Sequence, residues 1–277
     1  MKTALLTLGG ALAAGAMAAA CFVWAGVYDI SANEAHTQPV HSLLELTMHR
    51  SVKRHAAGIA TPRLDDEALI ARGALCFRDH CVQCHGGPGV AQGGIGRSMQ
   101  PLPGPLVDAP QHWKPRELYW ITRNGIKMSG MPAWQHRLAD DELWAVVAFM
   151  QRLPALTAAD FVSQAGPQLP GRCQGLADAP AMPLAPDAER GRRALTQHAC
   201  SACHRIPGVT GSPVQVGPPL AGIGRRTLIA GRVPNTPEQL QRWIREPQHL
   251  KPGTAMPDLE VGAQDAADIA AYLTTLR

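Results

Sequence analysis

A five-residue cysteine and histidine pattern occurs twice in this 277-residue chain, at residues 81–85 and 200–204, and both copies read C-x-x-C-H. The two thiols of such a motif can form thioether bonds to the vinyl groups of one haem, and the histidine can bind its iron. A single C-x-x-C also occurs at zinc sites and at thioredoxin-like redox sites. Two copies, each with histidine directly after, favour two covalently attached haem c groups over a structural zinc site.

Each motif is followed, at a similar distance, by a Met-Pro pair that suits the sixth coordination position of the iron. Met131 precedes Pro132, and Met256 precedes Pro257. A thioether ligand raises the reduction potential relative to a second imidazole. Met128 is the alternative ligand in the first half. The predicted haem-binding residues are Cys81, Cys84, His85, Met131, Cys200, Cys203, His204 and Met256, of which His85, Met131, His204 and Met256 bind iron.

The pattern of helices and motifs also repeats, which indicates a tandem duplication with an all-α fold. We expect an N-terminal membrane anchor at 1–28, a connector at 29–66, a first domain at 67–156, a linker at 157–186 and a second domain at 187–277. The 24 prolines and 27 glycines favour small helical units joined by irregular loops. The linker prediction rests on a segment rich in proline, alanine and glycine.

Helix start and stop signals place the expected helices at 42–56, from 67 to the first motif, 115–124, 140–153, 187–203, from 237 onward, and 264–276. Gly73 and Gly191 occupy equivalent positions in the first helix of each domain. We expect them to let that helix cross closely over the last helix of its domain, near Phe149 and Tyr272 respectively.

The stretch from Ala4 to Tyr28 contains no charged residue. It reaches the roughly 20 residues that a membrane-spanning helix needs. A cleaved signal peptide is the alternative, but its apolar region is usually about 7–15 residues long. A retained anchor is therefore favoured, and lipidation of Cys21 is a minor alternative.

Charge and the remaining cysteines carry weaker signals. The net charge of +4 comes without a dense basic and aromatic patch, so nucleic acid is not an expected partner. The basic cluster at 49–55 is interpreted as a solvated helix face, with a docking or lipid-contacting surface as the alternative. A Cys76–Cys173 disulfide is conceivable, but we expect a buried thiol and a loop thiol because the sequence supplies no geometry.

Several residues are expected to support the haems. The carbonyl of Pro218 is a candidate acceptor for the His204 imidazole. The first domain lacks the corresponding Gly-Pro-x-Leu, so Pro103 and Pro105 are the candidates for this role at His85. Candidate partners of the haem propionates are Arg225, Arg226 and Trp243 in the second domain and Trp113 or Trp134 in the first.

Together these features resemble class I cytochromes c over residues 67–154 and 187–277. Residues 124–134, which include Gly130-Met131-Pro132, are similar to membrane-anchored cytochromes c of proteobacteria. Residues 243–257, which include Ala255-Met256-Pro257, are similar to cytochrome c domains fused or associated with haem-copper oxidases. The resemblance implies a helical fold and one-electron transfer.

The expected function is therefore a dihaem electron carrier on the bacterial cytoplasmic membrane, with its haem domains facing the periplasm. The expected donor is a quinol-oxidising complex or a dehydrogenase, and the expected acceptor is an oxidase or a soluble cytochrome. No small-molecule substrate is expected. An electron-transfer subunit of a dehydrogenase or terminal oxidase is the alternative. A dihaem peroxidase is a second alternative. Two methionine ligands argue against it, because a peroxidase needs an iron with an open coordination position.

Overall fold

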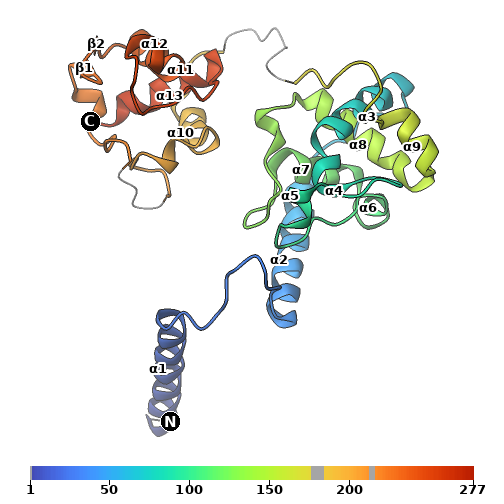
Figure 1. The fold of residues 1–277 in the computed structure, drawn as a ribbon. Coiled ribbons are helices and arrows are strands. Elements are labelled where there is room, and N and C mark those ends of the chain that lie inside the picture. Colours follow the sequence, from blue (N-terminus) through green and yellow to red (C-terminus); the bar gives the residue numbers. More distant parts are fainter. Residues whose placement is uncertain (1, 176–183, 212–215) are drawn as a thin grey trace. The chain divides into compact units, whose positions relative to one another are not determined.

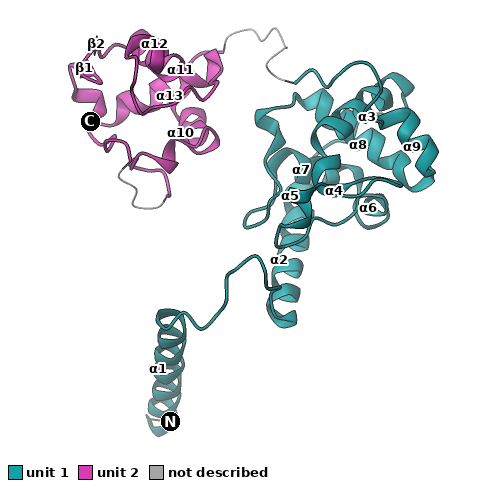
Figure 2. Cartoon of the chain, viewed as in Figure 1, with its two compact units in different colours: residues 1–176 teal, residues 177–277 magenta. Residues whose placement is uncertain are grey.

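A computed structural model describes residues 2–175, 184–211 and 216–277. The chain divides into two compact units, residues 1–176 and 177–277, each with a hydrophobic core of its own (Figure 2). The described part is mainly helical, and its one sheet is a two-stranded antiparallel pair in the second unit. The predicted all-α fold class is confirmed.

The first unit contains the apolar N-terminal helix and a bundle of further helices (Figure 1). Its α-helices are α1 Lys2–Trp24, α2 Gln38–Ala56, α3 Glu67–His80, α4 Val82–His85, α5 Gly94–Arg97, α6 Ala109–His112, α7 Pro115–Asn124, α8 Asp140–Arg152 and α9 Ala158–Ala165, and its 3-10 turns are η1 Trp134–His136 and η2 Leu153–Ala155.

The helices α3 and α8 form the centre of the first core. They cross so closely that a Cβ atom on Gly73 would lie 1.9 Å from the carbonyl oxygen of Ala145 and 3.1 Å from Cβ of Phe149. Phe77 on α3 packs against Phe149 on α8, with ring centroids 5.4 Å apart. The predicted close crossing near Phe149 is therefore present, and it fixes the helix that leads into the first C-x-x-C-H motif.

Helix α9 corrects the predicted linker, which was expected to begin at residue 157. Thr157 caps this helix by accepting a hydrogen bond from the backbone N–H of Asp160. Phe161 is buried in the first core, and its ring lies against Gly87, just after the first motif. Residues 158–165 thus form part of the first domain because Phe161 completes its core. Residues 176–183 of the predicted linker lie outside the described residues.

The disulfide between Cys76 and Cys173 is a second correction, because both were expected to be unpaired. Side chains of the first domain hold the chain that follows α9 beside α3. Arg78 donates hydrogen bonds to the carbonyls of Leu169 and Gly171, at 3.0 and 2.7 Å. The backbone N–H of Cys173 donates to Asp79 at 2.8 Å. These contacts bring two cysteines that lie 97 positions apart into bonding range.

Helix α1 is long and apolar enough to cross a membrane, with a mean hydropathy of 1.9 and no buried residue. A signal sequence would have a similar length and composition. Helix α2 follows after residues 25–37 and packs its second half against α7. There Val52 and Ala56 are buried, and the rings of His49 and Trp113 stack 4.3 Å apart.

The second unit repeats the arrangement with fewer elements. It contains α10 Ala188–Gln197, η4 Cys200–Ala202, η5 Ile223–Arg225, β1 Leu228–Ile229, β2 Val233–Pro234, α11 Pro237–Arg245, α12 Pro247–Leu250 and α13 Ala263–Thr275. In the sheet, Leu228 pairs with Pro234 and Ile229 with Val233. Helix α10 packs against α13 as α3 packs against α8.

The predicted close crossing is present in the second unit as well. A Cβ on Gly191 would meet the carbonyl oxygen of Asp268 at 1.9 Å, four residues before Tyr272, just as Ala145 lies four residues before Phe149. Tyr272 itself donates a hydrogen bond to the carbonyl of Pro207 at 2.6 Å. One detail differs from expectation: the first helix ends at Gln197 rather than at 203, because Ala199 adopts a left-handed conformation with φ 55°.

Candidate haem-binding sites

The first C-x-x-C-H motif lies at the turn between α3 and α4. Cys81 ends α3, donating its backbone N–H to the carbonyl of Phe77, and the short α4 carries Cys84 and His85. A Cβ on Gly96 would lie 2.9 Å from Cα of Cys84, so α5 lies directly against the motif. The fold therefore holds both thiols and the imidazole within one rigid turn.

The imidazole of His85 is oriented by a backbone carbonyl. Its Nδ1 lies 2.7 Å from the carbonyl oxygen of Gly104, which can only accept, so Nδ1 carries the proton and Nε2 keeps its lone pair. Burial lowers the pKa of His85, although the bond to Gly104 acts in the opposite direction. The ring is thus neutral at neutral pH, as iron binding requires. The expected acceptor, Pro103 or Pro105, is wrong by one residue.

The second motif has the same arrangement. The 3-10 turn η4 carries Cys200, and Nδ1 of His204 lies 2.7 Å from the carbonyl oxygen of Pro218, which confirms the predicted acceptor. A Cβ on Gly217 would lie only 2.4 Å from Cε1 of His204. Glycine is therefore required at 217 for the ring to lie flat against this loop.

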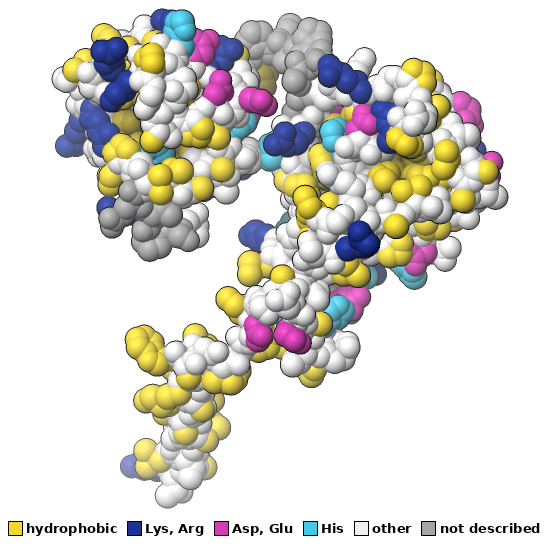
Figure 3. Space-filling view, viewed as in Figure 1, with side chains coloured by type: hydrophobic (Ala, Val, Ile, Leu, Met, Phe, Trp, Pro, Cys, Tyr) yellow, Lys and Arg dark blue, Asp and Glu magenta, His cyan; other side chains and the backbone are white. Residues whose placement is uncertain are grey.

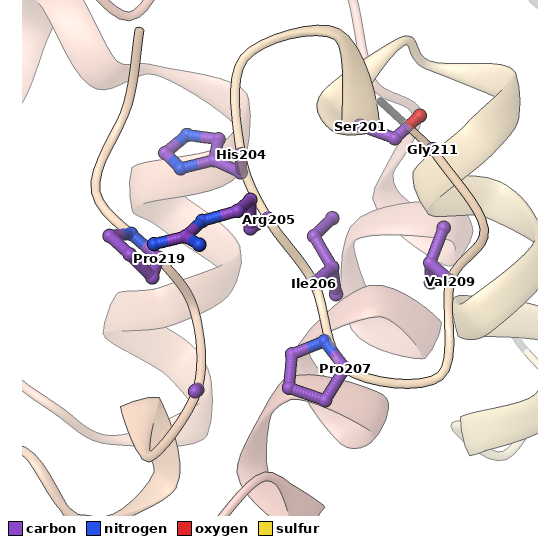
Figure 4. Close-up of a pocket in the computed structure, with 9 residues that line it drawn as sticks. Ser201, His204, Arg205, Ile206, Pro207, Val209, Gly211 and Pro219 are labelled. Atoms are coloured by element: carbon purple, nitrogen blue, oxygen red, sulfur yellow. The ribbon is translucent and has the colours of Figure 1, made fainter. Parts of the chain in front are cut away.

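A cavity opens beside each motif histidine. One of about 400 Å³ is lined by residues that include His85, Gly104 and Arg97. The other, of about 500 Å³, lies beside His204, with Ile206 and Val209 on its wall (Figure 4). Both combine one imidazole with a mainly apolar lining, which suits a large flat apolar group with a metal at its centre. The residues present therefore fit a haem at each motif.

The four motif cysteines form no disulfide. Burial raises the pKa of Cys81 to about 12 and that of Cys200 to about 11, so both thiols are protonated at neutral pH. Cys84 and Cys203 are partly exposed. All four are available for thioether formation.

The two predicted methionine ligands lie on loops that pack against the core of their own domain. Met131 packs against the first core, whereas Met128 is 96% exposed. Met256 packs against the second core, to which Cys200 also contributes. These contacts favour Met131 over Met128 as the residue that faces the interior.

Side chains that the sequence did not indicate hold both methionine loops. In the second domain, Nε2 of Gln248 donates to the carbonyls of Thr254 and Met256, at 2.7 and 2.8 Å, and its Oε1 accepts from Gly253 N–H at 3.2 Å. In the first, the backbone N–H of Met131 donates to Ser129 Oγ at 3.2 Å. A Cβ on Gly130 would lie 2.5 Å from the sulfur of Met99, so that thioether packs against the same loop.

The expected propionate partners occupy varied surroundings. Trp243 is buried in the second core, and Trp134 is buried beside His80, with ring centroids 4.9 Å apart. Arg226 donates to the carbonyl of Pro219 at 2.6 Å. The cationic side chains on the cavity walls are Arg97 and Arg205, which the sequence did not single out.

Two family models match the chain, one in each unit. The model described as cytochrome c oxidase, cbb3-type, subunit III matches residues 68–150, and the model described as cytochrome c matches residues 188–277. The matched ranges contain both C-x-x-C-H motifs and both Met-Pro pairs.

Two curated proteins are similar to part of the chain, and both are named cytochrome c oxidase subunit 2. The protein from Alkalihalophilus pseudofirmus is 37% identical over 91 residues, which cover 32% of this chain and 26% of that protein. The protein from Bacillus sp. (strain PS3) is 36% identical over 65 residues, which cover 23% and 18%. The matched stretches thus span about a quarter or less of these relatives.

Proposed function

Because the chain carries two cytochrome c domains in tandem after an apolar helix, we propose that it is a membrane-anchored dihaem protein that passes single electrons in a periplasmic respiratory chain. The observation that carries the proposal is the equivalent pair of hydrogen bonds, His85 to Gly104 and His204 to Pro218. Each leaves one imidazole nitrogen free beside a cavity. When bound, each haem supplies an Fe(II)/Fe(III) couple.

The residues of the chain attach, orient and protect the two groups. Cys81, Cys84, Cys200 and Cys203 would form the thioether links, and His85 and His204 would bind the irons. The carbonyls of Gly104 and Pro218 fix the plane of each imidazole and increase its basicity. Met131 and Met256 would supply the second protein ligand of each iron, which would hinder the binding of exogenous ligands.

Similarity to oxidase subunits suggests where the electrons go. Both curated relatives are named as subunits of cytochrome c oxidase, and the first family model describes another oxidase subunit. We propose that the chain delivers electrons to a terminal oxidase, as a subunit of that complex or as a separate anchored donor. A quinol-oxidising complex or a dehydrogenase supplies them.

The haem content of the purified full-length protein tests the proposal. We expect two covalently bound haems per chain, and one in the Cys81→Ser, Cys84→Ser variant, measured after denaturing electrophoresis and by alkaline pyridine absorbance. A redox titration of the same sample should show two waves at the high potentials typical of methionine ligation. Low-potential waves or rapid peroxide turnover would contradict the proposal. Copurification of oxidase subunits in mild detergent separates the subunit from the separate donor.

A further inference from the structure

The first half of α2 carries exposed leucines on the side that points away from the first domain. Val52 marks the buried side of α2, where the helix packs against α7. At about 100° per residue, Leu43 lies opposite Val52, and Leu46 lies about 60° from Leu43. Their exposed fractions are 65% and 55%. This stripe is an apolar surface without a partner among the described residues.

Three basic residues continue the same side of the helix. Arg50, Lys53 and Arg54 all lie within about 80° of Leu43 around the axis, about two to three turns further along. All three are exposed, and none has a carboxylate partner among the described residues. The one acidic residue of α2, Glu45, lies on the opposite side and pairs with His41 at 3.8 Å. We call Leu43, Leu46, Arg50, Lys53 and Arg54 the outer face of α2.

The chain connects this face closely to the apolar helix. Residues 25–37 join the end of α1 to the start of α2, and a connector of this length spans at most about 45 Å. If α1 crosses the bilayer, α2 begins within that reach of the membrane surface, with its leucines first and its basic residues later. Figure 3 shows hydrophobic side chains along α1 and on the first part of α2.

We propose that the outer face of α2 docks on the anionic lipid surface of the membrane that α1 crosses. Leu43 and Leu46 enter the interface, and the basic side chains bind lipid phosphates. The membrane interface offers acyl chains that suit the leucines and phosphates that suit the lysine and arginines of this face. The docked helix, through its contacts with α7, holds the first haem domain at the membrane. This inference rests on the proposed function, because it requires α1 to remain in the bilayer.

Hydrogen exchange of the full-length holoprotein in nanodiscs tests the docking. Backbone amides of residues 38–48 are compared in discs of phosphatidylcholine alone, in discs with equal parts of phosphatidylglycerol, and in detergent. We expect the exchange of these amides to be at least about tenfold slower in the anionic discs than in the other two samples. Because each basic residue near an anionic surface contributes about fivefold to the binding constant, the Arg50→Gln, Lys53→Gln, Arg54→Gln variant should weaken docking by about a hundredfold.

A charge-matched control is Arg193→Gln, Arg232→Gln, Arg245→Gln, which removes three exposed basic residues from the second domain and should leave the protection unchanged. Equal exchange in anionic discs and in detergent overturns the docking. Protection that survives the α2 variant, or that requires a copurified protein, overturns lipid as the partner. If the haem absorbance separates from the discs, the anchor assigned to α1 is wrong and the docking fails with it.

Discussion

The imidazole Nδ1 of His204 lies 2.7 Å from the carbonyl oxygen of Pro218, and the loop backbone at Gly217 lies against the face of the same ring. In the first domain His85 makes the equivalent bond to Gly104, also at 2.7 Å. Two loops of different sequence thus present a carbonyl in the same place. Each site needs an imidazole ring with a fixed orientation and one free nitrogen. A backbone carbonyl can provide this without a particular side chain at its position.

Gly217→Ala should disturb the second haem site selectively. The added Cβ would lie 2.4 Å from Cε1 of His204, which forces the ring or the loop to move, at a cost of about 1–3 kcal/mol. We expect the covalent haem content to fall from two toward one per chain. Gly262→Ala is the matched control, because it lies in the same domain outside this cavity and no atom lies within 4 Å of its Cβ. Two haems with an unchanged ferric spectrum in Gly217→Ala would count against the assigned role of this glycine.

Gln248→Ala should loosen the ligand loop of the second domain. Loss of its two donated bonds to the carbonyls of Thr254 and Met256 weakens the closed loop by about 1–2 kcal/mol, which is about tenfold in its opening equilibrium. We expect cyanide to bind the ferric second haem about tenfold more tightly. His249→Ala, an exposed neighbour, should behave as the parent protein. Unchanged cyanide binding in Gln248→Ala would show that the amide does not hold the loop.

The two helix crossings should be equally intolerant of a methyl group. In Gly73→Ala and Gly191→Ala the new Cβ would lie 1.9 Å from a backbone oxygen, so the paired helices must separate. The greater helix propensity of alanine, at most about 1 kcal/mol, cannot compensate. We expect each variant to lose about 3 kcal/mol of stability in its own domain, measured by guanidinium unfolding. Gly58→Ala, with no atom within 4 Å of its Cβ, is the control.

Removal of the disulfide should destabilise the first domain alone. Cys76→Ala, Cys173→Ala opens a loop closed over 97 positions, and the expected loss is about 2–4 kcal/mol. Guanidinium unfolding of the holoprotein measures it, with the second domain as internal reference. The Cys21→Ala variant should unfold as the parent protein does. An unchanged first transition would mean that the contacts of Arg78 and Asp79 suffice to hold this segment.

Local signals in the sequence predicted most of the helices, since caps and prolines act within one turn. The helix at 115–124 has the predicted bounds because Pro115 starts it and Gly125 ends it. The carbonyl of Pro218 was predicted from a local Gly-Pro pair, whereas Gly104 was not, because its loop carries a proline on either side. Local chemistry therefore gave most of the longer helices and one of the two histidine acceptors.

Contacts between distant segments could not be predicted in the same way. Helix α9 has a local signal in Thr157 and Asp160, but its place in the core depends on the fit of Phe161 against Gly87. The disulfide requires Cys76 and Cys173 to approach to a Cα distance of 4.5 Å, which only the folded first domain produces. The bonds of Gln248 to the methionine loop likewise join side chain to backbone across a turn.

Each haem is proposed to have one histidine and one methionine ligand, and the ferric absorption spectrum tests this claim. The full-length holoprotein should show the sulfur-to-iron charge-transfer band near the red end of the spectrum. Met131→Leu and Met256→Leu should each remove about half of its amplitude, and the double variant should remove all of it. Met128→Leu, at an exposed position, should leave the band intact. A band that is absent from the parent protein, or that persists in the double variant, would contradict the claim.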